Sequence, residues 1–320
     1  MKRILSIFFH NVISHRLEGD LYQSKQITID ELAWILEFLK RRYEPISLET
    51  FLDLYLGRRR HRICKTPILI GFDDGHAGAF YNGGPVLEEL KVPAVIFTLG
   101  KPLIDNQFVP PYIEFFYLIR MASIRQGNFR GKPYNLDRSG GFEVIRKEWA
   151  LCRAHNYDIF LTNLSQVFRV KRPTLVDLPE DLSYVKPAQL KNYPGMDYLR
   201  VASHAMTHIP LTWLTSSQKQ RELEESHELL WKICPTYDEA ISYPDGAHDE
   251  QTCQFAKSIY KIAFAVETDA SFQNRYAYPR ECISSGDAAT IRYAFSLRRR
   301  WIIIPIKAMI RNIQLKKGIL

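Results

Sequence analysis

The sequence predicts an α/β fold built on a parallel β-sheet, and three observations support this. An apolar strand over 67–72 is followed by an acidic turn, the helical segment "GGPVLEELK" and the β-rich segment "VPAVIFTLG". The same alternation returns in "AISYPDG", "EQTCQFAKSI" and "KIAFAVET". Strand, helix and strand in this order are typical of parallel βαβ units with both sheet faces covered. The 320 residues, 46% of them hydrophobic and 24% charged, suffice for a large globular core.

Charge and cysteine content narrow the function classes. The formal net charge of +8 suits an anionic partner or lipid surface, but a solvated basic face explains it at least as well. No aromatic-basic motif or recognition helix supports nucleic-acid binding, so we expect none. The five cysteines are odd in number and contain no C-x-x-C. They indicate free thiols in a reducing compartment and no disulfide framework or thiolate zinc site.

The N-terminal segment predicts a first buried strand. Its apolar run, Ile4 to Phe9, ends at His10, is too short for a signal peptide and has no small-residue cleavage site. Nowhere are there 18 consecutive apolar residues. We therefore expect a cytoplasmic protein.

Two helices follow the first strand. Thr28 is a predicted N-cap with Glu31 as its capping-box partner, and Ser47 begins a second helix that stops at Gly57. Apolar residues recur at helical spacing in the first of them: Leu32, Ile35, Leu36 and Leu39.

The middle of the chain, from about 101 to 195, has a different residue pattern. Aromatic and basic residues alternate with breakers such as "DRSGG" and "KRPTLVDLPEDL", which favours a largely helical insertion. Regular order returns at "DYLRVASHAMTH", a short strand leading into a histidine-bearing turn. The helix "TSSQKQRELEESHELLWKI" follows, with Leu223, Leu230 and Ile233 on its buried side.

Two carboxylates directly follow the strand over 67–72. Burying Asp73 and Asp74 beside it is costly unless something compensates their charge. His204 and His208, four residues apart, lie on one side of a helical turn or tight loop. With Asp74 they would make a three-ligand zinc site with an open position for water, and Asp73 would be free as a base. The aspartate pair and the histidine pair each follow a predicted parallel strand. Ligands of α/β proteins bind at the carboxyl ends of such strands.

At these residues the chain resembles the polysaccharide deacetylase family, which is carbohydrate esterase family 4 and includes chitin, peptidoglycan and poly-N-acetylglucosamine deacetylases. "GFDDG" at 71–75 is similar to the first family motif, Thr-Phe-Asp-Asp-Gly. "SHAMTH" at 203–208 is similar to the second, Ser-His-x-x-x-His, and "SYPDG" at 242–246 to a short form of the third. The opening "FFHN" and the late "KIAFAVET" and "YPRECI" also resemble family members.

The resemblance covers about 1–100 and 182–285. It implies an irregular (β/α) barrel of about seven strands. We therefore expect a barrel domain over 1–297, interrupted by the insertion at about 101–195, and a separate basic amphipathic tail over 298–320.

The resemblance also implies an activity, the metal-dependent removal of an acetyl group from an N-acetylated sugar. Asp73 would be the general base and a metal-bound water the nucleophile. Asp74, His204 and His208 would bind the metal, with Zn²⁺ expected. The backbone N–H of Tyr243 would help hold the oxyanion.

Three departures from the family pattern affect the site. Gly71 stands where the family usually has Thr, and Ile241 and Ser242 stand where an arginine often orients the base. Arg280 in "YPRE" is the candidate substitute for that arginine. Many members also use a late Leu-x-x-His histidine as general acid, and this chain has no histidine after residue 248.

His10 is the first candidate for the missing acid and His248 the second. A hydrogen-bonded histidine at a strand end is an equally good interpretation of His10. His76, after the acidic turn, could face the site but fits a partly exposed turn position better. The aromatics of one insertion segment fit a packed helix better than a sugar platform; these are Tyr112, Phe115, Phe116 and Tyr117.

The tail over 298–320 combines apolar and basic residues and contains Pro305. It fits a helix lying on an anionic membrane, and equally one docked on the barrel.

Our first hypothesis is an enzyme that removes an N-acetyl or other N-acyl group, such as formyl, from a nucleotide- or lipid-linked sugar in surface glycan biosynthesis. The alternative is a catalytically silent relative that binds glycan or scaffolds a biosynthetic complex.

Overall fold

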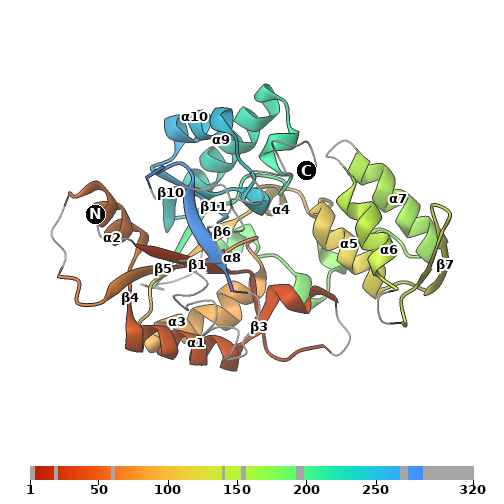
Figure 1. Cartoon of the computed structure of the whole chain (residues 1–320), viewed down its shortest axis with the longest axis horizontal. Helices are drawn as coiled ribbons and strands as arrows, with labels where there is room; N and C mark the ends of the chain where they lie inside the picture. The colour runs from red at the N-terminus through yellow and green to blue at the C-terminus, as the bar shows by residue number, and fades with distance from the viewer. Residues whose placement is uncertain are drawn as a thin grey trace, which may run out of the picture.

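Figure 1 shows the computed structural model of the chain. It describes residues 4–17, 21–58, 62–138, 141–152, 156–191, 198–266 and 273–283. The tail predicted over 298–320 lies outside the described residues. In the described part of the chain, no helix is both long enough and apolar enough to cross a membrane.

Seven parallel strands close into a barrel. In spatial order they are β1 (Leu5–Phe9), β12 (Tyr278–Cys282), β11 (Ile262–Val266), β10 (Tyr237–Ser242), β9 (Leu199–Ser203), β6 (Ala94–Thr98) and β5 (Thr66–Phe72). The pairing of β1 with β5 closes the ring, and β4 (Tyr43–Pro45) adds to the start of β5 outside it. The predicted irregular (β/α) barrel of about seven strands is confirmed.

Helices cover the outside of this barrel (Figure 1). They are α1 (Ile29–Arg42), α2 (Leu48–Leu56), α3 (Gly84–Leu90), α9 (Ser216–Ile233) and α10 (Glu250–Ile259). The predicted capping box is present, because Thr28 accepts from the Glu31 N–H and Glu31 accepts from the Thr28 N–H. Ser47 caps α2, and Gly57 ends it in a left-handed conformation at φ 65°.

Strand β5 shows why the barrel strands are apolar on both faces. Ile68, Ile70 and Phe72 pack outward in the core formed with the helices, whereas Leu69 packs inside the barrel. Side chains alternate along a strand, so the interior face continues through residues 71 and 73. The strand therefore directs Asp73 into the barrel, where a charge must find a partner.

The insertion lies between β6 and β9 and forms a lobe beside the barrel (Figure 1). It contains α4 (Lys101–Ile104), α5 (Pro111–Arg120), α6 (Glu143–Ala150), α7 (Tyr157–Phe168), α8 (Pro187–Lys191) and the short helices η4 (Leu175–Asp177) and η5 (Glu180–Leu182). It is largely helical, as expected, and α5, α6 and α7 share an aromatic core of their own.

The sequence analysis missed one element of the insertion, the antiparallel hairpin of β7 (Gln126–Phe129) and β8 (Lys132–Asn135). Its two-residue turn places Arg130 and Gly131 at φ 50° and 75°. Tight hairpins need positive φ at both turn residues, which Asn-Gly signals far more clearly than Arg-Gly.

A second small parallel pair follows β1 at the top of the barrel. Strand β2 (Asn11–Ile13) pairs with β3 (Gln26–Thr28), with Asn11 opposite Gln26, and the short helix η1 (Leu21–Lys25) leads into β3. The five cysteines are free thiols, as expected.

Candidate active site

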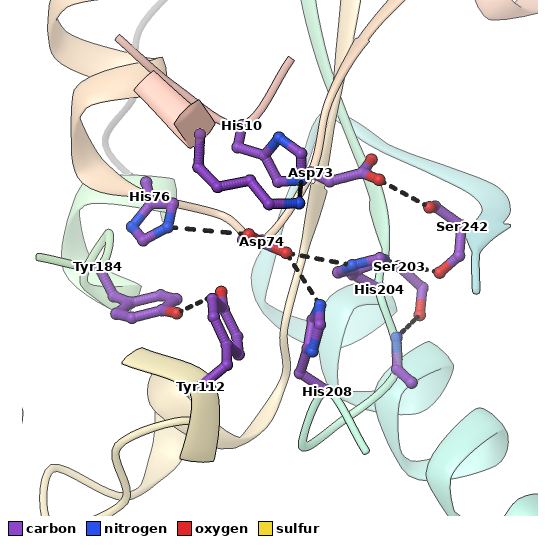
Figure 2. A network of polar contacts seen from close by, with 12 residues as sticks. His10, Asp73, Asp74, His76, Tyr112, Tyr184, Ser203, His204, His208 and Ser242 are labelled. Carbon is purple, nitrogen blue, oxygen red and sulfur yellow. Dashed lines mark hydrogen bonds and ion pairs between the residues drawn. The ribbon is translucent and has the colours of Figure 1, made fainter. Parts of the chain in front are cut away.

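A cavity of about 370 Å³ opens at the carboxyl ends of the barrel strands. Asp73 and Asp74 follow β5, and His204 and His208 follow β9; all four line this cavity. The structure therefore brings together the two motifs that the sequence placed 130 residues apart (Figure 2).

The acidic turn depends on backbone geometry that few residues tolerate. Asp74 and Gly75 have φ of 73° and 77°. A Cβ on Gly75 would lie 2.1 Å from Thr98 Oγ1, so only glycine fits there. The Asp73 N–H donates to the Phe9 carbonyl at 2.8 Å, which ties the turn to the end of β1.

The histidines lie on a tight loop, one of the two arrangements left open by the sequence. His208 has a left-handed φ of 65°. Glu222 on α9 holds the loop by accepting from the N–H groups of Met206 and Thr207 at 2.9 and 3.0 Å. Nothing in the sequence singled out Glu222, since its only signal is its place on a helix facing this loop.

Three ligand atoms converge on one point (Figure 2). Asp74 Oδ1 lies 3.3 Å from His204 Nε2 and 3.2 Å from His208 Nε2, and the three atoms all lie within 4.8 Å of one another. His204 Nδ1 lies 2.7 Å from the Ser242 carbonyl; donating there leaves the Nε2 lone pair facing Asp74.

These atoms fit a divalent cation. Tetrahedral zinc with bonds of about 2.0–2.1 Å has ligand atoms about 3.3 Å apart, close to both distances above. Asp74 Oδ1 is buried with no hydrogen-bond partner. Burial alone would raise the pKa of Asp74, but His208 and His204 hold that pKa well below its usual range. A carboxylate and two imidazole nitrogens aimed at one another therefore form a candidate cation site.

The partner of Asp73 is Arg280. Its guanidinium donates from Nη1 to Asp73 Oδ1 at 2.8 Å and from Nη2 to Oδ2 at 2.7 Å, and the Ser242 hydroxyl donates to Oδ2 at 3.2 Å. Burial would raise the pKa of Asp73, but the charge of Arg280 outweighs it and lowers that pKa. The candidate substitute predicted from "YPRE" thus occupies the expected place.

Gly71 and Arg280 are structurally linked departures. A Cβ at Gly71 would lie 3.6 Å from Arg280 Nη1 and 3.2 Å from the Phe97 ring. The guanidinium stacks over Phe8 at 4.2 Å and Phe97 at 5.0 Å inside the barrel. Glycine at 71 and the small Ser242 leave room for an arginine that arrives from β12.

His10 lies in the cavity wall, but its protonation is opposite to what a general acid needs. It is 6% exposed and its Nε2 lies 3.0 Å from Lys25 Nζ. Burial, with help from the charge of Lys25, lowers the pKa of His10 to about 3. A neutral imidazole that accepts from an ammonium group has no acidic proton to give, which counts against His10 as the general acid.

The structure also counts against Tyr243 and His248. The backbone N–H of Tyr243 donates to the Phe264 carbonyl at 3.0 Å, so it is not available to an oxyanion as we predicted. Parallel pairing of β10 with β11 consumes that donor. The His248 ring stacks on Tyr243, and its Nδ1 lies 2.9 Å from the Gly246 carbonyl, away from the cavity wall.

His76 is fully buried, contrary to the partly exposed turn position that we predicted. The segment before α8 covers it: His76 pairs with Tyr184 in an isolated β-bridge, and Tyr22 lies 2.9 Å from its Nε2. Its Nε2 is 3.8 Å from Asp74 Oδ2. The insertion, whose place in space the sequence did not reveal, buries this histidine.

Aromatic side chains of the insertion line the same cavity. Tyr112 lies against His208 with ring centroids 4.3 Å apart, and Phe116, Trp149 and Tyr157 complete this wall. Phe115 packs in the insertion core instead. The helix α5 therefore both packs, as predicted, and presents aromatic rings to the site.

Comparisons with known proteins agree with this site. The profile described as "Polysaccharide deacetylase" matches residues 61–260, more than half of the chain. YxkH of Bacillus subtilis (strain 168), a protein named for the polysaccharide deacetylases, is 32% identical over 91 residues, which are 28% of this chain and 33% of YxkH. The chain thus aligns with about a third of that relative's length.

Three solved structures share the fold. The de-N-acetylase from Aggregatibacter actinomycetemcomitans has a TM-score of 0.56 at 13% identity, over 91% of this chain and 99% of its own. IcaB from Ammonifex degensii has a TM-score of 0.54 at 13% identity, over 92% of this chain and 97% of its own. The deacetylase PplD from Streptococcus pyogenes has a TM-score of 0.51 at 16% identity, over 88% of this chain and 92% of its own. The profile match over more than half of the chain shows that the chain belongs to the polysaccharide deacetylase family, and the three structures share its barrel fold.

Proposed function

We propose that this protein is a zinc-dependent hydrolase that removes an N-acetyl group from a sugar. One observation carries the proposal: the cation site of Asp74, His204 and His208 adjoins the ionised Asp73 in one cavity. Two imidazoles and one carboxylate suit zinc better than magnesium or calcium, which prefer oxygen ligands.

The chain's own groups divide the work. Asp73, kept ionised by Arg280, accepts the proton of the attacking water. Asp74, His204 and His208 would hold the cation, which would polarise the acyl carbonyl and acidify a water molecule. Ser242 and Arg280 together fix both oxygens of Asp73, so the base is oriented before substrate arrives.

Aromatic side chains beside the polar groups support a sugar substrate. Tyr112, Phe116, Trp149 and Tyr157 offer apolar ring faces next to the cation site. The resemblance to a named de-N-acetylase, and to a deacetylase solved in complex with acetate, supports acetyl as the acyl group.

The cellular setting is part of the proposal. The protein would act in the cytoplasm on a nucleotide- or lipid-linked precursor of a surface glycan, with the tail over 298–320 touching the inner membrane face. The net charge of +8 supports an anionic partner of this kind. Fractionation of cells expressing the full chain and a chain ending at residue 297 tests the tail: only the full chain should sediment with membranes.

Elemental analysis and acetate release test the activity. Wild type should bind about one zinc and release acetate from at least one of N-acetylglucosamine, its β-1,4-linked tetramer and UDP-N-acetylglucosamine. Asp74→Ala and His204→Ala should lose both the metal and the activity. Asp73→Asn should keep the metal and lose activity by at least about 100-fold.

Matched controls use residues outside the cavity. Asp137→Asn, on the insertion surface, and His15→Ala, on an exposed loop, should change neither metal content nor activity. Failure of wild type to bind zinc or cobalt would overturn the metal site. Metal binding with no acetate release from any of the three substrates would favour the silent glycan-binding relative.

A further inference from the structure

The site described so far has a base and a cation site but no group to protonate the departing amine. Breaking an amide without such a proton would expel an unstable amide anion, so a donor is needed. The Arg280 guanidinium is hydrogen-bonded to Asp73, and His10 is neutral, so neither Arg280 nor His10 supplies this proton. Among the described side chains that line the cavity, Lys25 carries the only ammonium or guanidinium group.

Strand register explains why Lys25 reaches the site. In the parallel pair of β2 and β3, Asn11 lies opposite Gln26. The residues just before this pair, His10 and Lys25, are therefore brought together, and the Lys25 Nζ donates to His10 Nε2 at 3.0 Å. His10 thereby fixes the end of a flexible side chain at the cavity wall.

The insertion braces this pair of strands. The Asn11 side chain donates to the Asp181 carbonyl at 2.7 Å, and the Gln26 side chain donates to Asp181 Oδ2 at 3.1 Å. Arg120 of α5 forms two hydrogen bonds of 2.9 Å with the same carboxylate. Asp181 thus ties the neighbours of both His10 and Lys25 to the lobe that supplies the aromatic wall.

We propose that Lys25, positioned by His10, is the general acid that protonates the departing amine. The inference rests on the proposed deacetylase function. As the C–N bond breaks, its electron pair takes a proton from Lys25 Nζ, which becomes a neutral amine. Asp73 has taken the proton of the attacking water and later releases it to solvent, so one water adds across the amide to give the free amino sugar and acetic acid, which ionises to acetate. Lys25 is exposed, so it regains a proton from solvent.

Leaving-group dependence separates this role from others. The leaving group of 4-nitrophenyl acetate departs as a stable phenolate and needs no proton, whereas an amide does. Zinc-loaded wild type and Lys25→Met are therefore compared on this ester and on the best amide among the three sugars above. Lys257→Met, on the exposed face of α10, is the matched control.

Lys25→Met should lose about 100-fold or more in kcat on the amide and stay within about threefold of wild type on the ester. Its zinc content and Tm should match those of wild type. In Lys25→Ala, added methylammonium should restore part of the amide activity. Lys257→Met should behave as wild type on both substrates.

Three outcomes would overturn the inference. Equal losses on ester and amide would mean that Lys25 supports the site as a whole, and a rise in KM alone would mean that it binds an anionic part of the substrate. Unchanged amide hydrolysis would exclude any role. A wild type that hydrolyses the ester but none of the amides would instead sink the proposed function, and the acid role with it.

Discussion

The cavity has two sides that are built in different ways. The proposed metal-ligand side consists of Asp74, His204 and His208, which come from two short motifs at the ends of β5 and β9. The assembled side consists of His10 and Lys25 in the cavity wall and of Arg280, which binds Asp73 from inside the barrel; each of the three is isolated in the sequence. Local turn geometry sets the first side, and pairing between distant strands sets the second.

This difference teaches how the site tolerates change. A metal ligand has one acceptable chemistry and one position, so its loss removes the whole function. On the assembled side, a residue from another strand can take over the same role. Arg280 orients Asp73 from β12 because Gly71 and Ser242 leave space for it. The assembled side is therefore where this chain departs from its family.

The largest effect is expected at the buried ion pair of the assembled side. Arg280→Met leaves Asp73 buried and unpaired, which should cost about 3–5 kcal/mol of unfolding free energy and most of the activity. Urea denaturation measures the first effect. Arg200→Met breaks a half-exposed pair with Asp238 and should cost at most about 1 kcal/mol. Equal costs for the two would contradict the distinction.

Double substitution sharpens this result. Arg280→Met with Asp73→Asn removes both charges, so it should recover much of the stability lost in Arg280→Met alone but none of the activity. No recovery would mean that the arginine stabilises the barrel through its stacking on Phe8 and Phe97 and not through Asp73.

The second prediction tests the link between Gly71 and Arg280. Gly71→Thr adds atoms where a Cβ alone would lie 3.2 Å from the Phe97 ring. It should cost about 1–3 kcal/mol through overpacking, and kcat should fall more than KM changes because Arg280 no longer orients Asp73. Gly71→Ala should show a smaller effect in each measurement. Wild-type kinetics in Gly71→Thr would show that the two positions are independent.

The third prediction concerns Asp181, which supports the strand next to Lys25 from outside the cavity. Asp181→Ala removes the acceptor that joins Arg120 and Gln26, a part-buried set that we expect to contribute about 1–2 kcal/mol. Hydrogen exchange should accelerate in β2 and β3 while zinc content stays unchanged. Asp177→Ala, which affects only the exposed Thr174 cap, is the control. Loss of zinc in Asp181→Ala would show that the two sides are coupled.

The last prediction is a pH dependence of stability carried by His10. The unfolded chain protonates this residue near pH 6.5, but the folded chain does so only near a pKa of about 3. The unfolded state therefore binds more protons between these values. Stability should fall as pH falls through that window, by at most about 1.4 kcal/mol per pH unit from this group. Zinc-free His10→Gln should lose less stability between pH 6.5 and 4.5 than zinc-free wild type, measured by urea midpoint.

Much of the fold could be predicted from local patterns. The strand ending at Phe72, the capping box of Thr28 and the α2 stop at Gly57 each depend on a few adjacent residues. The β7–β8 hairpin was missed because Arg130-Gly131 is a weak turn signal. The burial of His76 was missed because it depends on Tyr184, more than a hundred residues away.

By itself the sequence determined the barrel class and the Asp-His-His cluster proposed to bind the metal, because strand alternation and short motifs act over a few residues whose spacing fixes their geometry. Arg280 could be named from the sequence only as a candidate. Only the tertiary structure decided that it meets Asp73, that the Tyr243 N–H is consumed by the sheet, and that Lys25 stands beside a neutral His10. Such contacts follow from strand register and burial, which join residues that share no local pattern.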